Sequence, residues 1–179
     1  WMKPWLRVVT GLSAENAAQL LFAMTLTFIG GFLTLGIIAE RLSQLFDVHM
    51  ISISVFGMTI FLFVQGTMIF GGFSSPLILV ILLGFFGTAS VLVYAGYAQI
   101  FPKNLSGRVS TFLNLLVFIG AFILQWSFGS IIEMWPATGK GYDPESYQAA
   151  FGLLVIMQSA GLIWYLLSKK LFRKQSILI

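Results

Sequence analysis

The sequence predicts an all-α fold, a polytopic bundle of transmembrane helices. Apolar side chains make up 58% of the 179 residues and charged side chains only 9%, and the mean hydropathy is +0.94. The apolar residues form five runs that are each long enough to cross a bilayer, separated by short polar turns. A water-soluble domain of this length does not need so much apolar surface. We therefore expect a membrane protein with five spans.

The first 16 residues precede the first span and are rich in aromatic side chains. Trp1, Pro4 and Trp5 suit a segment at the level of the lipid headgroups, where tryptophan is enriched. The chain opens on Trp1 without the pattern of a signal peptide, and we expect it to be part of a longer protein. Residues 1–16 are accordingly interpreted as an outer interfacial segment with the tip of a truncated helix.

The first two spans are expected at about residues 17–39 and 50–70. Ser13 caps the first helix, and a short polar turn over residues 40–49 joins the two spans. The first span also contains small residues that allow helices to approach closely: Gly30, Gly31 and Gly36.

A tight turn over residues 71–76 leads into the third span, at about residues 77–100. Pro76 is at a position where the first turn of a helix accepts proline. The span is rich in small residues, and Ser90, Tyr94 and Tyr97 form a polar patch on it. We interpret this patch as lining a cavity, whereas Gly84 and Gly87 are expected to serve packing.

The fourth span, residues 109–132, has no charged side chain and two lone amides. At about 1.5 Å rise per residue it covers roughly 36 Å, more than the ~30 Å of a hydrocarbon core. Asn114 and Gln125 are eleven residues apart, which at about 100° per residue returns them to within roughly 20° of one face. An amide facing lipid would be unsatisfied. This face should therefore point into protein or a wet cavity, unless the amides only bond neighbouring helices.

The fifth span is expected at about residues 147–167, after a loop over residues 133–147. Asp143, Pro144 and Glu145 are a good helix start, with a cap, a proline in the first turn and an acid. Residues 17–168 thus form the five-helix transmembrane part, and residues 169–179 form a basic tail.

Basic residues are distributed unequally between the two sides of the membrane. One side receives seven of the ten, which are Arg41, Lys103, Arg108, Lys169, Lys170, Arg173 and Lys174. The other side receives Lys3, Arg7 and Lys140. By the positive-inside rule the seven-residue side is cytoplasmic, which places the C-terminus in the cytoplasm.

The residue types exclude several functions. Cysteine is absent, so a thiolate metal site has no ligands. His49 is the single histidine, and at the end of a span it cannot by itself form a metal site or supply a catalytic dyad with a nucleophile. We expect no metal, no cofactor, no enzyme activity and no nucleic-acid partner. None of the five spans buries an ionisable group at depth, although proton-driven carriers usually place one there.

Three stretches resemble the C-terminal half of the major facilitator superfamily of transporters. G-I-I-A-E-R-L at residues 36–42 resembles the family's G-x-x-x-[DE]-R signature, without the further basic residues of the full pattern. S-G-R-V-S-T-F-L-N at residues 106–114 is similar to the start of the eleventh helix. W-M-K-P-W-L-R-V-V-T-G-L at residues 1–12 is similar to the outer end of the seventh, as in prokaryotic members labelled nitrate/nitrite or sugar-phosphate permease-like.

The resemblance implies a partial transporter fold with helices eight to twelve, in the prokaryotic cytoplasmic (inner) membrane. The N-terminal half of the same carrier is then a missing partner, besides the lipid bilayer and a small-molecule solute. It implies that Asn114, Gln125, Tyr94 and Ser90 line the substrate cavity, and that Gly36, Glu40 and Arg41 form an inner gate. Gln65 and Gln158 fall on peripheral helices and are expected to be structural.

We therefore expect a fragment of a secondary active transporter that moves a small polar or anionic solute by alternating access. The alternative is a five-span structural or assembly subunit without transport activity. For the gate residues the alternative is an ordinary helix end with an interfacial arginine. What separates carrier from subunit is whether the polar residues share a cavity or are used up in helix contacts.

Overall fold

The computed structural model describes residues 1–70, 75–138 and 141–175, and within these the chain is an all-α polytopic bundle. In the described part, five helical segments are long and apolar enough to cross a membrane. They are α2 (Ala14–Phe46), α3 (Met50–Thr67), the α4 to α5 segment, α6 (Lys103–Ile132) and α7 (Pro144–Gln175). The predictions of the fold class and of an integral membrane protein are confirmed.

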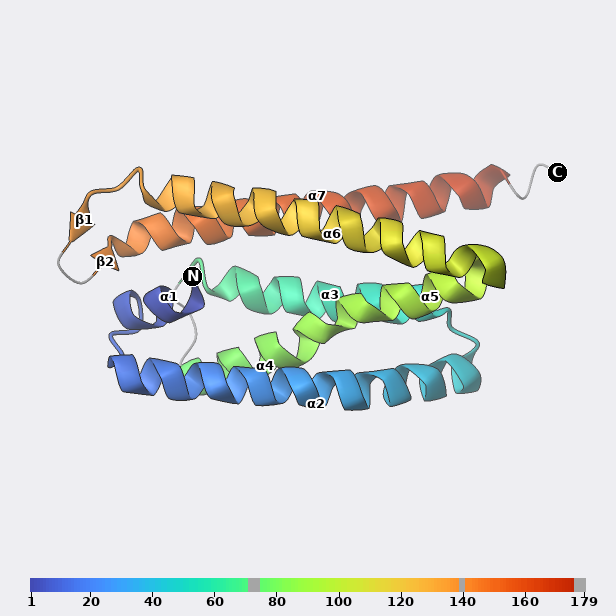
Figure 1. Cartoon of the computed structure of the whole chain (residues 1–179), viewed down its shortest axis with the longest axis horizontal. Helices are drawn as coiled ribbons and strands as arrows, with labels where there is room; N and C mark the ends of the chain where they lie inside the picture. Colours follow the sequence, from blue (N-terminus) through green and yellow to red (C-terminus); the bar gives the residue numbers. More distant parts are fainter. Residues whose placement is uncertain (71–74, 139–140, 176–179) are drawn as a thin grey trace.

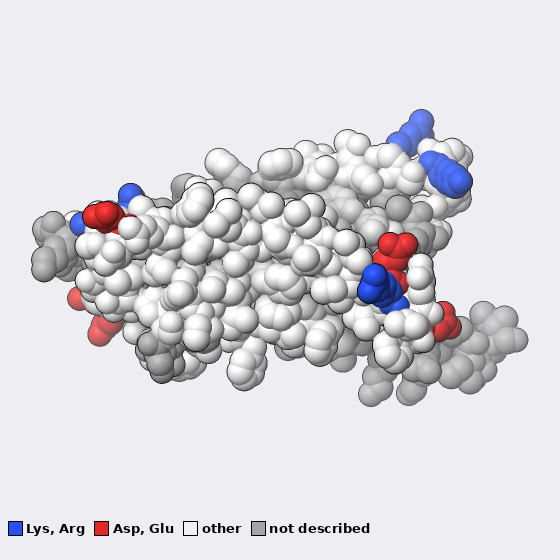
Figure 2. Space-filling model, turned by 90° about the horizontal axis from the view of Figure 1, so that it is seen from below, with Lys and Arg blue, Asp and Glu red and all other residues white. Residues whose placement is uncertain are grey.

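The long helices run side by side along one axis of the molecule (Figure 1). Helix α2 packs mainly on α4 (Pro76–Gly87), while α3 contacts α4, α5 (Leu92–Ile100) and α7. Helix α6 contacts α5 near one end of the bundle and packs along α7. Figure 2 shows a broad belt without charged side chains, with the charged residues gathered at the two ends. This distribution is the one that a bilayer requires.

The third span, expected at residues 77–100, is present over Pro76–Tyr97, but its middle is not α-helical. A 3₁₀ turn, η1 (Thr88–Val91), separates α4 from α5. The hydroxyls of Thr88 and Ser90 donate to the carbonyls of Phe85 and Gly87, three residues earlier, at 2.7 and 3.1 Å. Side-chain bonds of this kind compete with the α-helical pattern, and they accompany the tighter turn here.

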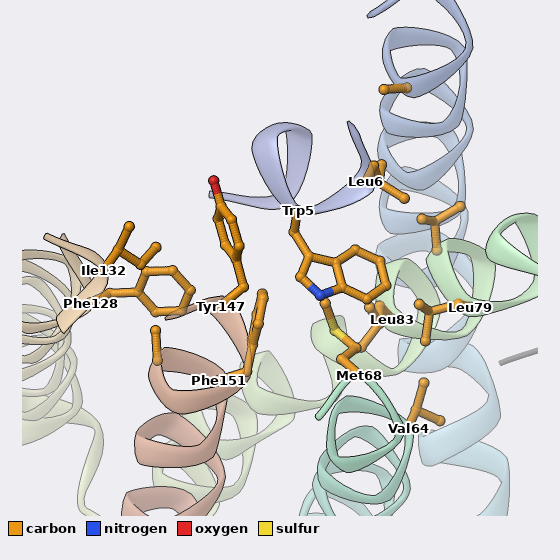
Figure 3. Close-up of a cluster of buried hydrophobic side chains, with 13 residues drawn as sticks. Trp5, Leu6, Val64, Met68, Leu79, Leu83, Phe128, Ile132, Tyr147 and Phe151 are labelled. Atoms are coloured by element: carbon orange, nitrogen blue, oxygen red, sulfur yellow. The ribbon is translucent and has the colours of Figure 1, made fainter. Parts of the chain in front are cut away.

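The N-terminal segment is a short helix, α1 (Met2–Val8), and it belongs to the core at one end of the bundle. Trp5 is 3% exposed and Leu6 is fully buried. In Figure 3 they meet side chains from other helices, among them Met68, Leu79 and Phe151. Protein side chains therefore cover the indole ring of Trp5. The interpretation of residues 1–16 as an outer interfacial segment stays a prediction.

The loop after α6 contains a short pair of strands that the sequence did not predict. β1 (Ala137–Thr138) pairs antiparallel with β2 (Gly141–Tyr142), in the register Ala137 to Tyr142. Gly141 has φ +135°, a conformation that L side chains rarely adopt. Most of the turn expected at residues 71–76 and the basic residue Lys140 lie outside the described residues.

Candidate functional site

Tyr94 and Asn114, two of the predicted cavity residues, are joined by a hydrogen bond. The Tyr94 hydroxyl on α5 donates to Asn114 Oδ1 on α6 at 2.8 Å. Tyr94 is half-buried and Asn114 is exposed. Because the amide nitrogen is not used by this bond, Asn114 keeps two N–H donors for another partner.

The other two predicted cavity residues do not join this pair through hydrogen bonds. Gln125 is exposed on α6, about 16 Å along the helix from Asn114. Its amide bonds to no residue that the structure describes. Ser90 is exposed in η1, one helical turn before Tyr94, and its hydroxyl donates to its own chain at Gly87.

The face formed by α5 and α6 exposes polar side chains within an apolar stretch. Of the residues of α6, the buried ones are Phe128 and Ile132, near its C-terminal end. Asn114 and Gln125 are both exposed within the charge-free stretch of this helix. Lipid offers no hydrogen-bond partner to an amide, so this face requires contact with protein or water.

The predicted gate residues lie in the C-terminal part of α2, and none of them bonds another helix within the part of the chain that the structure describes. Gly36 is half-buried and a Cβ there would meet open space. Glu40 and Arg41 are exposed, and Glu40 Oε1 accepts a long bond of 3.5 Å from Gln44 on the same helix. A gate needs a partner on a second helix. The assignment of Gly36, Glu40 and Arg41 as a gate stays a prediction.

Gln65 and Gln158 form the second link between helices through polar side chains. Gln158 Nε2 on α7 donates to Gln65 Oε1 on α3 at 2.9 Å. Gln65 is only 5% exposed. The pair fits the structural role expected for these residues, since the bond joins α3 to α7.

His49 lies at the start of α3 and has a capping role there. His49 Nδ1 accepts the backbone N–H of Ile51 at 3.3 Å and so caps α3. In the part of the chain that the structure describes, no three residues of the types His, Cys, Asp and Glu come together to hold a metal ion.

Sequence reasoning missed Ser54, which connects α3 to the break in the third span. Ser54 is fully buried, and its hydroxyl donates to the carbonyl of Ala89 at 2.7 Å. The same carbonyl accepts the backbone N–H of Leu92. A serine within an apolar helix was the available signal, although its partner lies 35 residues further along the chain.

We expect Ser54→Ala to lower the free energy of unfolding by about 1 kcal/mol, the usual value of a hydrogen bond between membrane helices. The measurement is unfolding of the purified protein in mixed detergent micelles. Thr59→Ala is the control, because Thr59 is exposed on the same helix and its hydroxyl donates to the carbonyl of Val55, within that helix. Equal losses for the two variants would contradict a stabilising link from Ser54 to η1.

The chain matches no protein-family model, and no curated protein or solved structure matches it.

Proposed function

We propose that this chain is the C-terminal part of a secondary transporter of the major facilitator type, which moves a small polar or anionic solute by alternating access. The observation that carries the proposal is the Tyr94–Asn114 pair, exposed within the apolar belt. A polar face at this depth is expensive in lipid, and such faces are usually associated with a solute path.

The chemistry of the face suits a polar or anionic solute. The Asn114 amide retains two N–H donors, and Gln125 on the same face supplies two more. Neutral donors in a site of low dielectric bind oxygen atoms of a solute without needing a counter-ion of their own. We assign Asn114, Gln125, Tyr94 and Ser90 to the cavity, and Gly36, Glu40 and Arg41 to the inner gate.

The exposure of α6 supports a further protein partner in the same carrier. In 103–127 every residue of α6 is at least partly exposed. We propose that an N-terminal half covers this face, that the protein lies in a prokaryotic cytoplasmic membrane, and that its C-terminus is cytoplasmic. The clustering of Arg41, Lys103, Arg108 and Lys169 at one end of the bundle supports this orientation.

A structural or assembly subunit is the second candidate, and one observation favours it. The Tyr94–Asn114 and Gln65–Gln158 pairs both use polar side chains in contacts between helices. If such contacts are the whole role of these residues, no water-filled path is needed.

Thiol labelling distinguishes the two candidates, because this chain has no cysteine of its own. Single variants Asn114→Cys and Gln125→Cys are expressed in the whole protein and treated in membranes with a charged, membrane-impermeant thiosulfonate. Cavity positions should react within minutes, because the reagent needs a water-exposed thiolate. Nitrate or a hexose phosphate, supplied as the test solute, should slow the reaction if it binds there.

Leu116→Cys and Ile123→Cys are the matched controls. They lie two residues from the test positions, roughly on the opposite face of α6, and are 49% and 51% exposed. The controls should not react, because the apolar surroundings of a lipid-facing position keep the thiol protonated. If positions 114 and 125 are as unreactive as 116 and 123, the face has no aqueous path and the transporter proposal fails.

A further inference from the structure

A groove lies between α3, α5 and α7. Its volume is about 310 Å³, and it is partly open. Apolar side chains at helical spacing line its α3 wall, namely Ile51, Val55, Met58 and Leu62. Gly161, Leu162 and Tyr165 line the wall formed by α7, and Tyr97 comes from α5. The groove is thus lined mainly by apolar side chains from three helices.

Two hydrogen bonds join α3 to α7 near the two ends of the groove. At the deep end Gln158 donates to Gln65 at 2.9 Å. At the other end Lys169 Nζ on α7 donates to Ser52 Oγ on α3 at 3.3 Å. Gln158 and Lys169 are eleven residues apart, so they lie on one face of α7 about 16 Å from each other.

This length corresponds to one leaflet of a bilayer. Half of a hydrocarbon core of about 30 Å is ~15 Å, so a chain entering beside Lys169 would end at the paired amides near the midplane. Lys169 is exposed and lies at the end of the apolar stretch of α7. Its ammonium group is therefore at the depth of the lipid headgroups.

The positive charge of Lys169 at one end of the groove favours an anionic occupant. Lys169 is followed in the sequence by Lys170, Arg173 and Lys174, and no acidic residue occurs after Glu145. Basic pockets between transmembrane helices recognise the headgroups of anionic lipids. The Tyr97 and Tyr165 rings supply apolar area along the groove, with hydroxyls available for ester or phosphate oxygens.

We propose that this groove is a binding site for one anionic phospholipid, with an acyl chain between α3, α5 and α7 and the phosphate on Lys169. The site is separate from the α5–α6 face, since neither Asn114 nor Gln125 lines it. It does not depend on whether the protein transports a solute.

The test measures the thermal unfolding of the purified, delipidated protein after addition of phosphatidylglycerol or phosphatidylcholine, both with dioleoyl chains. At about 100 times the dissociation constant, phosphatidylglycerol should raise the midpoint by about 5 °C or more. Phosphatidylcholine should raise it by less than half as much. Equal shifts from the two lipids would overturn the assignment of the headgroup to Lys169.

Two pairs of variants locate the site. A Cβ added at Gly161 or at Gly152 meets no atom within 4 Å, so both accept leucine, but only Gly161 lines the groove. Gly161→Leu should lose most of the lipid-induced shift and Gly152→Leu should keep it. Lys169→Gln should reduce the phosphatidylglycerol shift to the phosphatidylcholine level, and Lys169→Arg should retain it. A full shift in Gly161→Leu would place the lipid elsewhere and overturn the proposal.

Discussion

Gly84→Leu is expected to force α2 and α4 apart and to lower the free energy of unfolding by about 3 kcal/mol. A Cβ at Gly84 would lie 2.6 Å from the carbonyl oxygen of Met24 and closer still to the Thr27 hydroxyl oxygen. The carbonyl belongs to the backbone of α2, so a rotamer change cannot relieve the overlap with it. The two helices must separate, which opens the most extensive helix contact in the bundle.

The contact is equally close from the side of α2. A Cβ at Gly31 would lie 3.0 Å from the carbonyl oxygen of Phe85 and 2.6 Å from the Thr88 hydroxyl oxygen. Small residues that let two backbones approach are the usual basis of helix association in lipid, where apolar side chains gain little by leaving the bilayer. We therefore expect the effect of Gly84→Leu to come from helix packing.

Gly30→Leu is the matched control, because Gly30 is next to Gly31 but has no atom within 4 Å of its added Cβ. Its unfolding free energy in mixed micelles should differ from that of the unchanged protein by no more than about 0.5 kcal/mol. If the two leucine variants are equally stable, the close approach of α2 and α4 does not stabilise the protein.

The positions of the spans could be predicted because the bilayer sets their length. The first span was expected at residues 17–39 and the helix is Ala14–Phe46. The Ser13 cap is confirmed, since its side chain accepts the backbone N–H of Asn16 at 3.1 Å. The C-terminal end of this first helix was predicted too early, because Glu40 and Arg41 end the apolar run but the helix continues to Phe46.

The break in the third span could not be predicted from apolarity. Residues on both sides of η1 are apolar, and α4 and α5 together give the highest hydropathy of the five spans in the described part. The signal was local, in the hydroxyls of Thr88 and Ser90, and the supporting bond from Ser54 comes from a separate helix. A hydropathy averaged over a window of sequence records neither the local hydroxyl bonds nor the bond from a distant helix.

The sequence singled out Tyr94 and Asn114 separately but did not pair them. Helices α5 and α6 are joined at Pro102, with Tyr94 before this turn and Asn114 after it. Helices joined by so short a turn are neighbours, so a polar contact between α5 and α6 could have been predicted, although the spacing alone does not select these two residues. The Gln65–Gln158 bond could not be predicted, because it joins residues 93 apart whose helices need not be neighbours.

The N-terminal helix gives the second large effect. Trp5→Ala should lower the free energy of unfolding by about 3–5 kcal/mol, the usual cost of removing a buried aromatic ring. Trp5 is 3% exposed and its ring meets Phe151 edge to face, with centroids 6.1 Å apart. It therefore links α1 to α7, as well as to the residues around Met68 and Leu79 (Figure 3).

Trp5→Phe should recover most of this loss. The indole Nε1 of Trp5 is buried and has no hydrogen-bond partner among the described residues. An unpaired buried donor costs about 1–3 kcal/mol. Trp5→Phe buries a smaller ring than tryptophan, but it also removes this penalty.

Trp126→Ala is the control, because Trp126 on α6 is 69% exposed. Trp126→Ala should lower the free energy of unfolding in mixed micelles by about 0.5 kcal/mol or less. A tryptophan at headgroup level would be anchored by lipid, and in detergent Trp5→Ala would then behave like Trp126→Ala. A loss several times larger at Trp5 instead requires α1 to be a fixed part of the bundle, because detergent cannot replace the contacts with Phe151 and Met68.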